Sequence, residues 1–361
     1  MAARPAHVSA LRRAVSSPLD MLLSLIALLL GAAIVVPVAR WAIFDATWTG
    51  TSTTCRSVGG GACWAFIGHK LPFILFGLFP AELRWRPAVV TVLLLALIIM
   101  SAMPRFWRRS LLLTWAVGLG VSFWLMHGGA GLESVPTRAW GGLPITLMLT
   151  AMGLGAGFPL AVVLALGRRS NHAVPRVVAT TFVEVIRGIP LIAVLYVAAL
   201  VVPLAMPRGI ELEKLVLATG AVTVFAAAYL AEAVRAGLQV VPRGQYEAAF
   251  SLGLTWWQVM RRVVLPQALR VVSPSCVSIA VGFFQDTSLV VIIGLFDLLN
   301  TARLAAQDPD WLGFHAEALV FVAVLYFVGS AALSRYGLWL EKRFSYLGAA
   351  AARLRVERVA S

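Results

Sequence analysis

Charged side chains stand inside strongly apolar stretches of this 361-residue chain. Glu184 and Arg187 are three residues apart, and Glu232 and Arg235 repeat this spacing. Residues three apart share one face of a helix, so each pair is predicted to form an ion pair that lowers the cost of charge in lipid. Ionisable groups within a membrane also line transport pathways, so a structural and a pathway role both remain open.

A third polar group lies further along the chain, where Asp286 is followed by Thr287 and Ser288 in another apolar stretch. A carboxylate beside hydroxyl groups suits either a translocation pathway or the packing of helices. A zwitterionic ligand requires an anionic and a cationic partner together. The sequence leaves open whether this group and the charged pairs converge in space.

Signatures of enzymatic chemistry are absent from the sequence. It contains no G-x-x-x-x-G-K-[ST], because none of its lysines follows a glycine, and it contains no H-E-x-x-H. Its five histidines are scattered. We therefore predict no catalytic residue, no metal site and no ATPase site in this chain.

The segment YEAAFSLGLTWWQVMRRVVLP, residues 246–266, is too short for a domain and too patterned for a loop. Its first half predicts a short helix with a small, flat face that ends at Gly253. Its second half places Trp256, Val259, Met260 and Val263 on one apolar face of a second helix, which we expect to end at Leu265-Pro266. Two short helices joined at a glycine form either a peg for another protein or an interfacial segment on lipid headgroups.

The elements that must position these residues are membrane helices. Hydrophobic residues make up 60% of the chain, charged residues 13%, and the mean hydropathy is +0.87. About 20 apolar residues cross the hydrocarbon as a helix. We predict eight spans: 21–39, 88–103, 111–126, 143–166, 177–202, 215–234, 272–295 and 318–333.

The distribution of basic residues predicts the orientation. Most Lys and Arg residues fall in connections on the same side as the N-terminus, so both termini are expected in the cytoplasm. The first span is longer than the apolar core of a signal peptide and lacks a good cleavage site, so we expect it to be retained. The net charge of +14 is spread over these connections and predicts contact with anionic lipid rather than nucleic acid.

The spans divide near residue 138. Residues 1–137 form a three-span extension with an external loop, 41–87, in which Cys55 and Cys63 either pair in a disulfide or remain free. Residues 138–361 contain five spans and one long cytoplasmic connection, 239–270. Gly153 and Gly157 place small residues on one face of the first of these five, which favours close helix packing.

The central segment matches a known pattern. Its fixed residues are Glu247, Ala248 and Ala249, then Gly253, Val263, Leu265 and Pro266. Their spacing resembles the EAA loop of permease subunits of bacterial ATP-binding cassette importers, EAA-x3-G-x9-I-x-LP, with valine in place of isoleucine. Further stretches resemble the polar, general L-amino-acid branch of that family: WGGLPITLML, LALGRRS, FVEVIRGIPLI, AYLAEAVRAGLQVVPRGQYEAA and DTSLVVIIGLFDLL. Gln285 departs from the lysine that similar sequences often have.

The resemblance implies an all-α membrane protein with a type I importer permease core, crossing the bacterial inner membrane several times. It implies transport without an enzymatic centre or cofactor in this chain, since ATP and Mg are used by a separate ATPase subunit. That subunit docks on the coupling helix of the EAA loop. A second, homologous permease subunit, a periplasmic solute-binding protein and an amino-acid substrate are the other implied partners.

Two other classes of function compete with this one. An ion-coupled secondary amino-acid transporter would use Asp286 or Glu184, but the chain lacks matching interrupted helices in two halves. A membrane-embedded enzyme would need paired carboxylates, a histidine cluster or an activated serine, and none is readable from the sequence.

Overall fold

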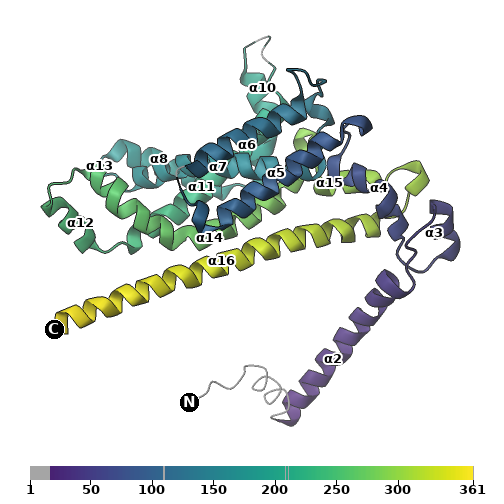
Figure 1. Cartoon of the computed structure of the whole chain (residues 1–361), viewed down its shortest axis with the longest axis horizontal. Coiled ribbons are helices and arrows are strands. Elements are labelled where there is room, and N and C mark those ends of the chain that lie inside the picture. Colours follow the sequence, from purple (N-terminus) through teal and green to yellow (C-terminus); the bar gives the residue numbers. More distant parts are fainter. Residues whose placement is uncertain (1–16, 109, 208, 210, 361) are drawn as a thin grey trace. The chain divides into compact units, whose positions relative to one another are not determined.

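Membrane-length helices dominate the structure (Figure 1). A computed structural model describes residues 17–108, 110–207, 209 and 211–360, with side chains described as far as residue 344. Within these residues, seven helices are long and apolar enough to cross a membrane, and a bent pair raises the number to eight if it is one span. The all-α fold with about eight spans is therefore confirmed. The seven are Pro18–Phe44, Ala81–Ala102, Ser110–His127, Gly142–Arg168, Lys214–Val240, Trp256–Ile293 and His315–Phe344.

The chain forms two compact units, one made of residues 1–70 and 306–318 and the other of residues 71–305 and 319–361. In the first unit, α2 (Pro18–Ala39) continues as a π-helical turn, η1 (Arg40–Phe44), and α3 (Ser52–Val58) follows. Cys55 and Cys63 form a disulfide. The external segment expected over 41–87 also contains α4 (Trp64–Phe76), whose 13 residues are too few to cross the hydrocarbon.

Residues 306–318 return to this first unit and hold its loop in place. The Nζ of Lys70 lies 2.6 Å from a carboxylate oxygen of Asp308, just before η8 (Pro309–Trp311). This hydrogen bond holds the pKa of the Asp308 carboxyl below its usual value. Phe66 packs against Trp311 and Phe314, with ring centroids 5.8 and 6.0 Å apart.

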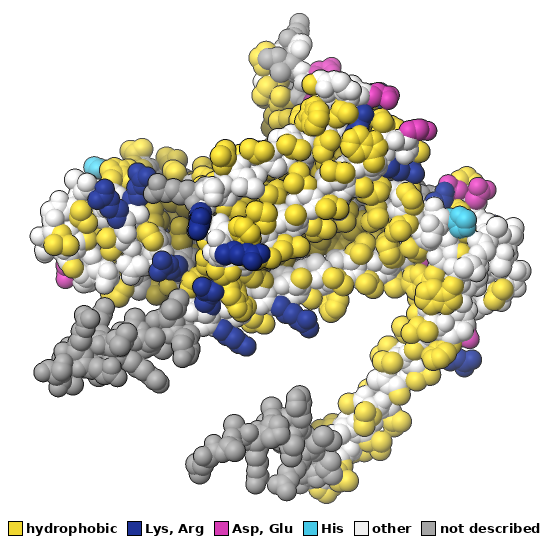
Figure 2. Space-filling view, viewed as in Figure 1, with side chains coloured by type: hydrophobic (Ala, Val, Ile, Leu, Met, Phe, Trp, Pro, Cys, Tyr) yellow, Lys and Arg dark blue, Asp and Glu magenta, His cyan; other side chains and the backbone are white. Residues whose placement is uncertain are grey.

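The second unit is built around α7 (Gly142–Arg168) and α11 (Lys214–Val240). The predicted small-residue face brings these helices together, because a Cβ at Gly153 would lie 2.4 Å from Val222 and one at Gly157 would lie 3.1 Å from Ala226. The buried side chains of the unit are largely aliphatic and aromatic. Figure 2 shows hydrophobic side chains over much of the outer surface as well, as expected of helices that face lipid.

The other helices and short elements of this unit follow in chain order. They are η2 (Ala81–Leu83), α5 (Trp85–Ala102), η3 (Pro104–Phe106), α6 (Ser110–His127), η4 (Thr137–Ala139), α8 (Ala173–Gly188), α9 (Leu191–Tyr196), η5 (Val197–Val201), α10 (Val202–Ala205), α12 (Arg243–Ser251), α13 (Trp256–Val259), η6 (Met260–Val264), α14 (Leu265–Asp286), η7 (Thr287–Ile293), β1 (Phe296–Asp297), α15 (Leu298–Ala305) and α16 (His315–Ala360), whose first residues belong to the other unit. The strand β1 pairs in parallel with Gly141 and Gly142, where α7 begins.

One predicted span is wrong as a continuous helix. The fifth, 177–202, is broken between α8 and α9, and the helical segments on the two sides of the break, Ala173–Gly188 and Leu191–Ala205, differ in direction by 104°. The break lies at Ile189, which has extended backbone angles of −113° and 147° directly before Pro190. A proline disfavours helical angles in the residue before it and lacks the N–H that a continuous helix would use.

Candidate functional site

The predicted peg is a helix–turn–helix formed by α12, α13 and η6 between α11 and α14. On α12, Glu247 and Ala248 are exposed, whereas Ala249 is buried with 4% of its surface exposed. Ala249 packs into a small apolar core with Val234 and Leu238 of α11 and Val259 of α13. One face of α12 therefore attaches the peg to the bundle, and the other is open.

Gly253 makes the turn between the two helices. Its φ is +74°, which suits glycine, and a Cβ at this position would have no atom within 4 Å. Its N–H donates to the carbonyl of Phe250 at 2.9 Å. A side chain at residue 253 would thus begin in open space.

The second helix of the peg begins at a capping box. The backbone N–H of Thr255 donates to the side chain of Gln258 at 2.9 Å, so α13 starts at Trp256. Val259 and Met260 of the predicted apolar face are buried and Val263 is partly buried, but Trp256 is 44% exposed. Most of this face anchors the peg, and its first residue belongs to the open surface.

The expected helix end at Leu265-Pro266 is wrong. The chain passes from α13 through the π-helical turn η6 directly into α14, and together with η7 these form one apolar helix, Trp256–Ile293. Pro266 occupies the first turn of α14, where a proline without an N–H is tolerated, and the wider turn before it accommodates the missing hydrogen bond. The peg is consequently continuous with a membrane span.

Polar contacts also connect the peg to the membrane helices. The guanidinium of Arg169 donates to the carbonyl of Leu238 at 2.6 Å and to the hydroxyl of Tyr246 at 3.3 Å. The side chain of Gln267 donates to that of Gln245 at 3.3 Å. These bonds connect α12 to the ends of α7 and α11 and to α14.

The open face of the peg is apolar and aromatic. Phe250, Leu252, Trp256 and Trp257 are 47%, 80%, 44% and 69% exposed. Trp256 and Trp257 stand edge to face, with ring centroids 4.7 Å apart. Grouped exposed aromatic residues on a rigid support are characteristic of protein–protein contact.

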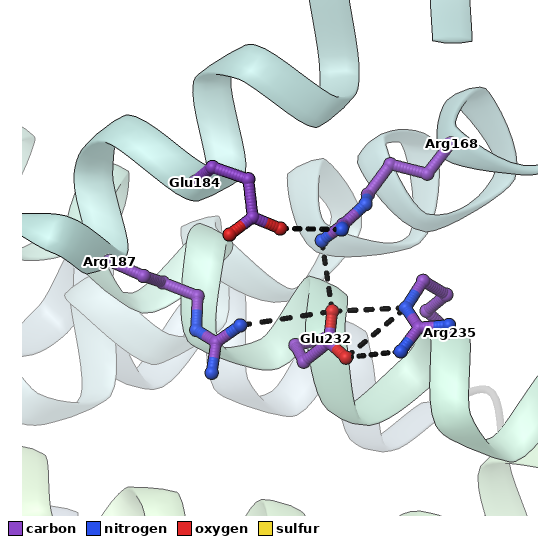
Figure 3. A network of polar contacts seen from close by, with 5 residues as sticks. All are labelled: Arg168, Glu184, Arg187, Glu232 and Arg235. Atoms are coloured by element: carbon purple, nitrogen blue, oxygen red, sulfur yellow. Dashed lines mark hydrogen bonds and ion pairs between the residues drawn. The ribbon is translucent and has the colours of Figure 1, made fainter.

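A network of five charged side chains joins α7, α8 and α11 (Figure 3). Arg168 bridges Glu184, at 2.7 Å, and Glu232, at 2.9 Å. The predicted pair of Glu184 with Arg187 is therefore wrong, because Arg187 points toward Glu232 at 3.8 Å. The predicted pairing of Glu232 with Arg235 is present, with Nε 3.0 Å from a carboxylate oxygen.

The third polar group stands apart from this network. Asp286 is half-buried at the end of α14 and forms no ion pair within the part of the chain that the structure describes. Thr287 is buried and donates to the carbonyl of Phe284 at 2.8 Å, and the carbonyl of Ser288 accepts from Asn300 at 2.8 Å. The hydroxyl of Thr287 thus has a structural partner.

Sequence reasoning missed two residues that organise these sites. In the sequence, Arg168 is one of several arginines in the predicted connections between spans. Only the packing of α8 against α7 identifies it as the residue that bridges two glutamates. Asp297 is fully buried and accepts from the backbone of Leu299 and Asn300 and from the hydroxyl of Tyr326. Its position directly before α15 was a usable signal for a helix cap.

Comparison with known proteins identifies the family. Residues 157–346 match the model of the binding-protein-dependent transport system inner membrane component. The chain belongs to this family. A relative of this importer component, the inner membrane amino-acid ABC transporter permease protein YhdY of Escherichia coli (strain K12), is 43% identical over 319 residues, covering 86% of each chain.

Other relatives extend the comparison. The glutamate/glutamine/aspartate/asparagine transport system permease protein BztC of Rhodobacter capsulatus is 31% identical over 418 residues, covering 95% of this chain and 96% of its own. Among solved structures, a crystal structure of an amino acid ABC transporter with histidines matches 56% of this chain and 91% of its own at 30% identity, with a TM-score of 0.49. The predicted resemblance to importer permeases is confirmed, and this inner membrane component is a multi-pass membrane protein.

Proposed function

We propose that this inner membrane component is the permease subunit of an ATP-driven importer of polar L-amino acids. The single observation that carries its coupling role is the exposed aromatic peg, which is anchored to α7 and α11 and continuous with α14. A force applied to such a peg reaches the membrane span without passing through a flexible joint. This arrangement supports a role for the peg as a coupling helix.

The substrate class rests on the relatives. YhdY is named for amino acids, and BztC for glutamate, glutamine, aspartate and asparagine. These names support a polar amino acid for this chain. Asp286 then becomes a candidate for the translocation pathway, because it lies in a span without a charged partner in the described part of the chain, and intramembrane carboxylates of this kind bind cations or ammonium groups.

The partners follow from the same assignment. A separate ATPase subunit, using ATP and Mg, docks on the peg, and its nucleotide-driven movement changes the angle of α14. A second, homologous permease subunit completes the pathway, and a periplasmic solute-binding protein delivers the amino acid. Both termini lie in the cytoplasm, on the side of the peg, as the distribution of basic residues favours.

Glu247, Ala248, Ala249, Gly253, Val263, Leu265 and Pro266 are the residues we assign to ATPase coupling. In the structure they divide into two groups. Glu247 and Gly253 belong to the exposed surface, whereas Ala249 and Val263 contact the supporting core. Substitution of the first group is expected to weaken docking, and substitution of the second to loosen the peg itself.

Gly253→Trp tests the docking role. Because a Cβ at residue 253 would have no atom of this chain within 4 Å, the variant is expected to insert normally, at a backbone cost of about 1–2 kcal/mol for a positive φ. The control is Gly59→Trp, at a helix end with φ of +60°, ψ of 164° and nothing within 4 Å of a Cβ, where the backbone disfavours a side chain at least as strongly. Each variant is purified from native membranes in mild detergent, and the bound ATPase subunit is quantified by mass spectrometry and by ATP hydrolysis.

We expect the Gly253 variant to lose the ATPase subunit and the Gly59 variant to keep it. Full retention of the ATPase subunit by the Gly253 variant would refute the role of the peg as a docking surface.

Uptake measurements separate the proposed importer from an ion-coupled transporter. An ATP-driven importer keeps working with an uncoupler while ATP is maintained and stops when ATP is depleted, and the reverse pattern would favour the ion-coupled alternative.

A further inference from the structure

A second cluster of charged and aromatic residues lies at the ends of helices that do not form the peg. The connection between α5 and α6 meets the last described turns of α16 there. The guanidinium carbon of Arg343 lies 5.8 Å from the ring centroid of Trp107 and 5.1 Å from that of Trp339. Trp107 also contacts Phe344, with centroids 6.3 Å apart.

Hydrogen bonds fix the aromatic part of this cluster. The indole N–H of Trp107 donates to the carbonyl of Ser101 at 2.8 Å, and that of Trp115 donates to the Ser101 hydroxyl oxygen at 2.8 Å. The Ser101 hydroxyl donates to the carbonyl of Leu97 at 2.8 Å. Trp107 is therefore a firm platform on which the Arg343 guanidinium is stacked.

The positive charges of the cluster are not neutralised. Arg105, Arg108 and Arg343 are exposed, and none forms a salt bridge within the part of the chain that the structure describes. The nearby acidic residue on α16, Glu341, is two positions from Arg343, which places it about 200° around the helix. Arg105 stacks on Phe106, at 4.8 Å from the ring centroid, and donates to the Met103 sulfur at 3.3 Å, and its remaining guanidinium N–H donors are available. The exposed guanidinium groups of Arg108 and Arg343 also present donors.

The cluster lies at the level of a membrane boundary. It is formed where the apolar segments Ala81–Ala102 and His315–Phe344 end and where Ser110–His127 begins. Tryptophan is enriched at this depth, and basic residues there meet lipid headgroups. In Figure 2, Lys and Arg side chains gather on the left-hand part of the face, between large areas of hydrophobic surface.

We propose that Arg105, Trp107, Arg108, Trp339 and Arg343 form a binding site for the headgroup phosphate of an anionic phospholipid. Planar guanidinium groups donate paired hydrogen bonds to phosphate oxygens, and the indole rings lie alongside the glycerol and the upper acyl chains. The acyl chains extend along the apolar surfaces of α5 and α16. This site links the N-terminal extension to the last helix through a lipid, and it does not depend on the proposed transport function.

The test compares lipid binding to the transporter complex in detergent by native mass spectrometry. Phosphatidylglycerol and phosphatidylcholine with the same acyl chains are titrated onto the wild type, Arg343→Gln and the control Lys342→Gln. The control removes the same charge from the adjacent residue, which lies on a different side of α16. An Arg105→Gln, Arg108→Gln double variant tests the site without altering α16.

We expect the wild type to prefer phosphatidylglycerol, and Arg343→Gln to weaken that binding about tenfold, the effect of losing one charge-assisted contact. Lys342→Gln should remain within about twofold of the wild type, and the double variant should lose affinity as Arg343→Gln does. Equal losses in Arg343→Gln and Lys342→Gln would overturn the site in favour of a general charge effect. No lipid preference in the wild type, or full displacement of the lipid by inorganic phosphate, would overturn it as well.

Discussion

Replacing Arg168 with glutamine is expected to destabilise the second unit by about 2 kcal/mol. The Arg168 side chain is 12% exposed and its partner Glu232 is 26% exposed, and a charge-assisted hydrogen bond in such surroundings contributes about 1.5–3 kcal/mol. Its other partner, Glu184, is 59% exposed, so that bond contributes about 0–1 kcal/mol. Glu184→Gln should thus be much milder than Arg168→Gln.

Thermal unfolding of the purified protein in detergent measures this difference. About 2–4 °C of Tm per kcal/mol gives an expected decrease of about 4–8 °C for Arg168→Gln and at most about 4 °C for Glu184→Gln. Arg176→Gln, which removes an exposed arginine of α8, is the control for charge alone. A decrease for Glu184→Gln as large as that for Arg168→Gln would refute the bridging role, and so would an equal decrease for Arg176→Gln.

Three further outcomes are expected. Gly237→Ala should destabilise the protein by about 1–3 kcal/mol, because its Cβ would lie 2.7 Å from a backbone carbonyl oxygen of α14, whereas Gly155→Ala, with nothing within 4 Å of its Cβ and a better helix former in place of glycine, should not lower the Tm. Cys55→Ser should cost about 2–3 kcal/mol of local stability, seen as faster hydrogen exchange in α3, while the ATPase subunit stays bound. The hydrogen bond from Lys70 lowers the pKa of the Asp308 carboxyl. The ion pair therefore stabilises the folded loop above the usual pKa of 3.8, and this stabilisation is lost as the pH falls through the lower folded-state pKa. In the wild type, hydrogen exchange of the backbone amides in residues 306–318, corrected for intrinsic rates, should therefore become faster only at such acidic pH. In Asp308→Asn the same amides should already exchange faster at neutral pH.

The coupling segment shows how far residue types and spacing reach. The short helix, the turn at Gly253 and the apolar face of Val259, Met260 and Val263 are local properties, and each is present in the structure. The end of the second helix was misjudged, because whether a proline ends a helix or begins one depends on the turn before it. Here η6 admits Pro266 without interrupting the helix.

The spans, the helix–turn–helix and the family pattern were determined by the sequence, since apolar length, helical periodicity and residue spacing depend on neighbours a few positions apart. Ion pairs between different helices were not. Glu184 could reach Arg187 on its own helix, but it contacts Arg168, sixteen positions earlier, because the packing of α8 on α7 brings that guanidinium closer. The same holds for the stacking of Arg343 on Trp107 and for the open face of the peg, because contacts between distant segments form only when the helices pack.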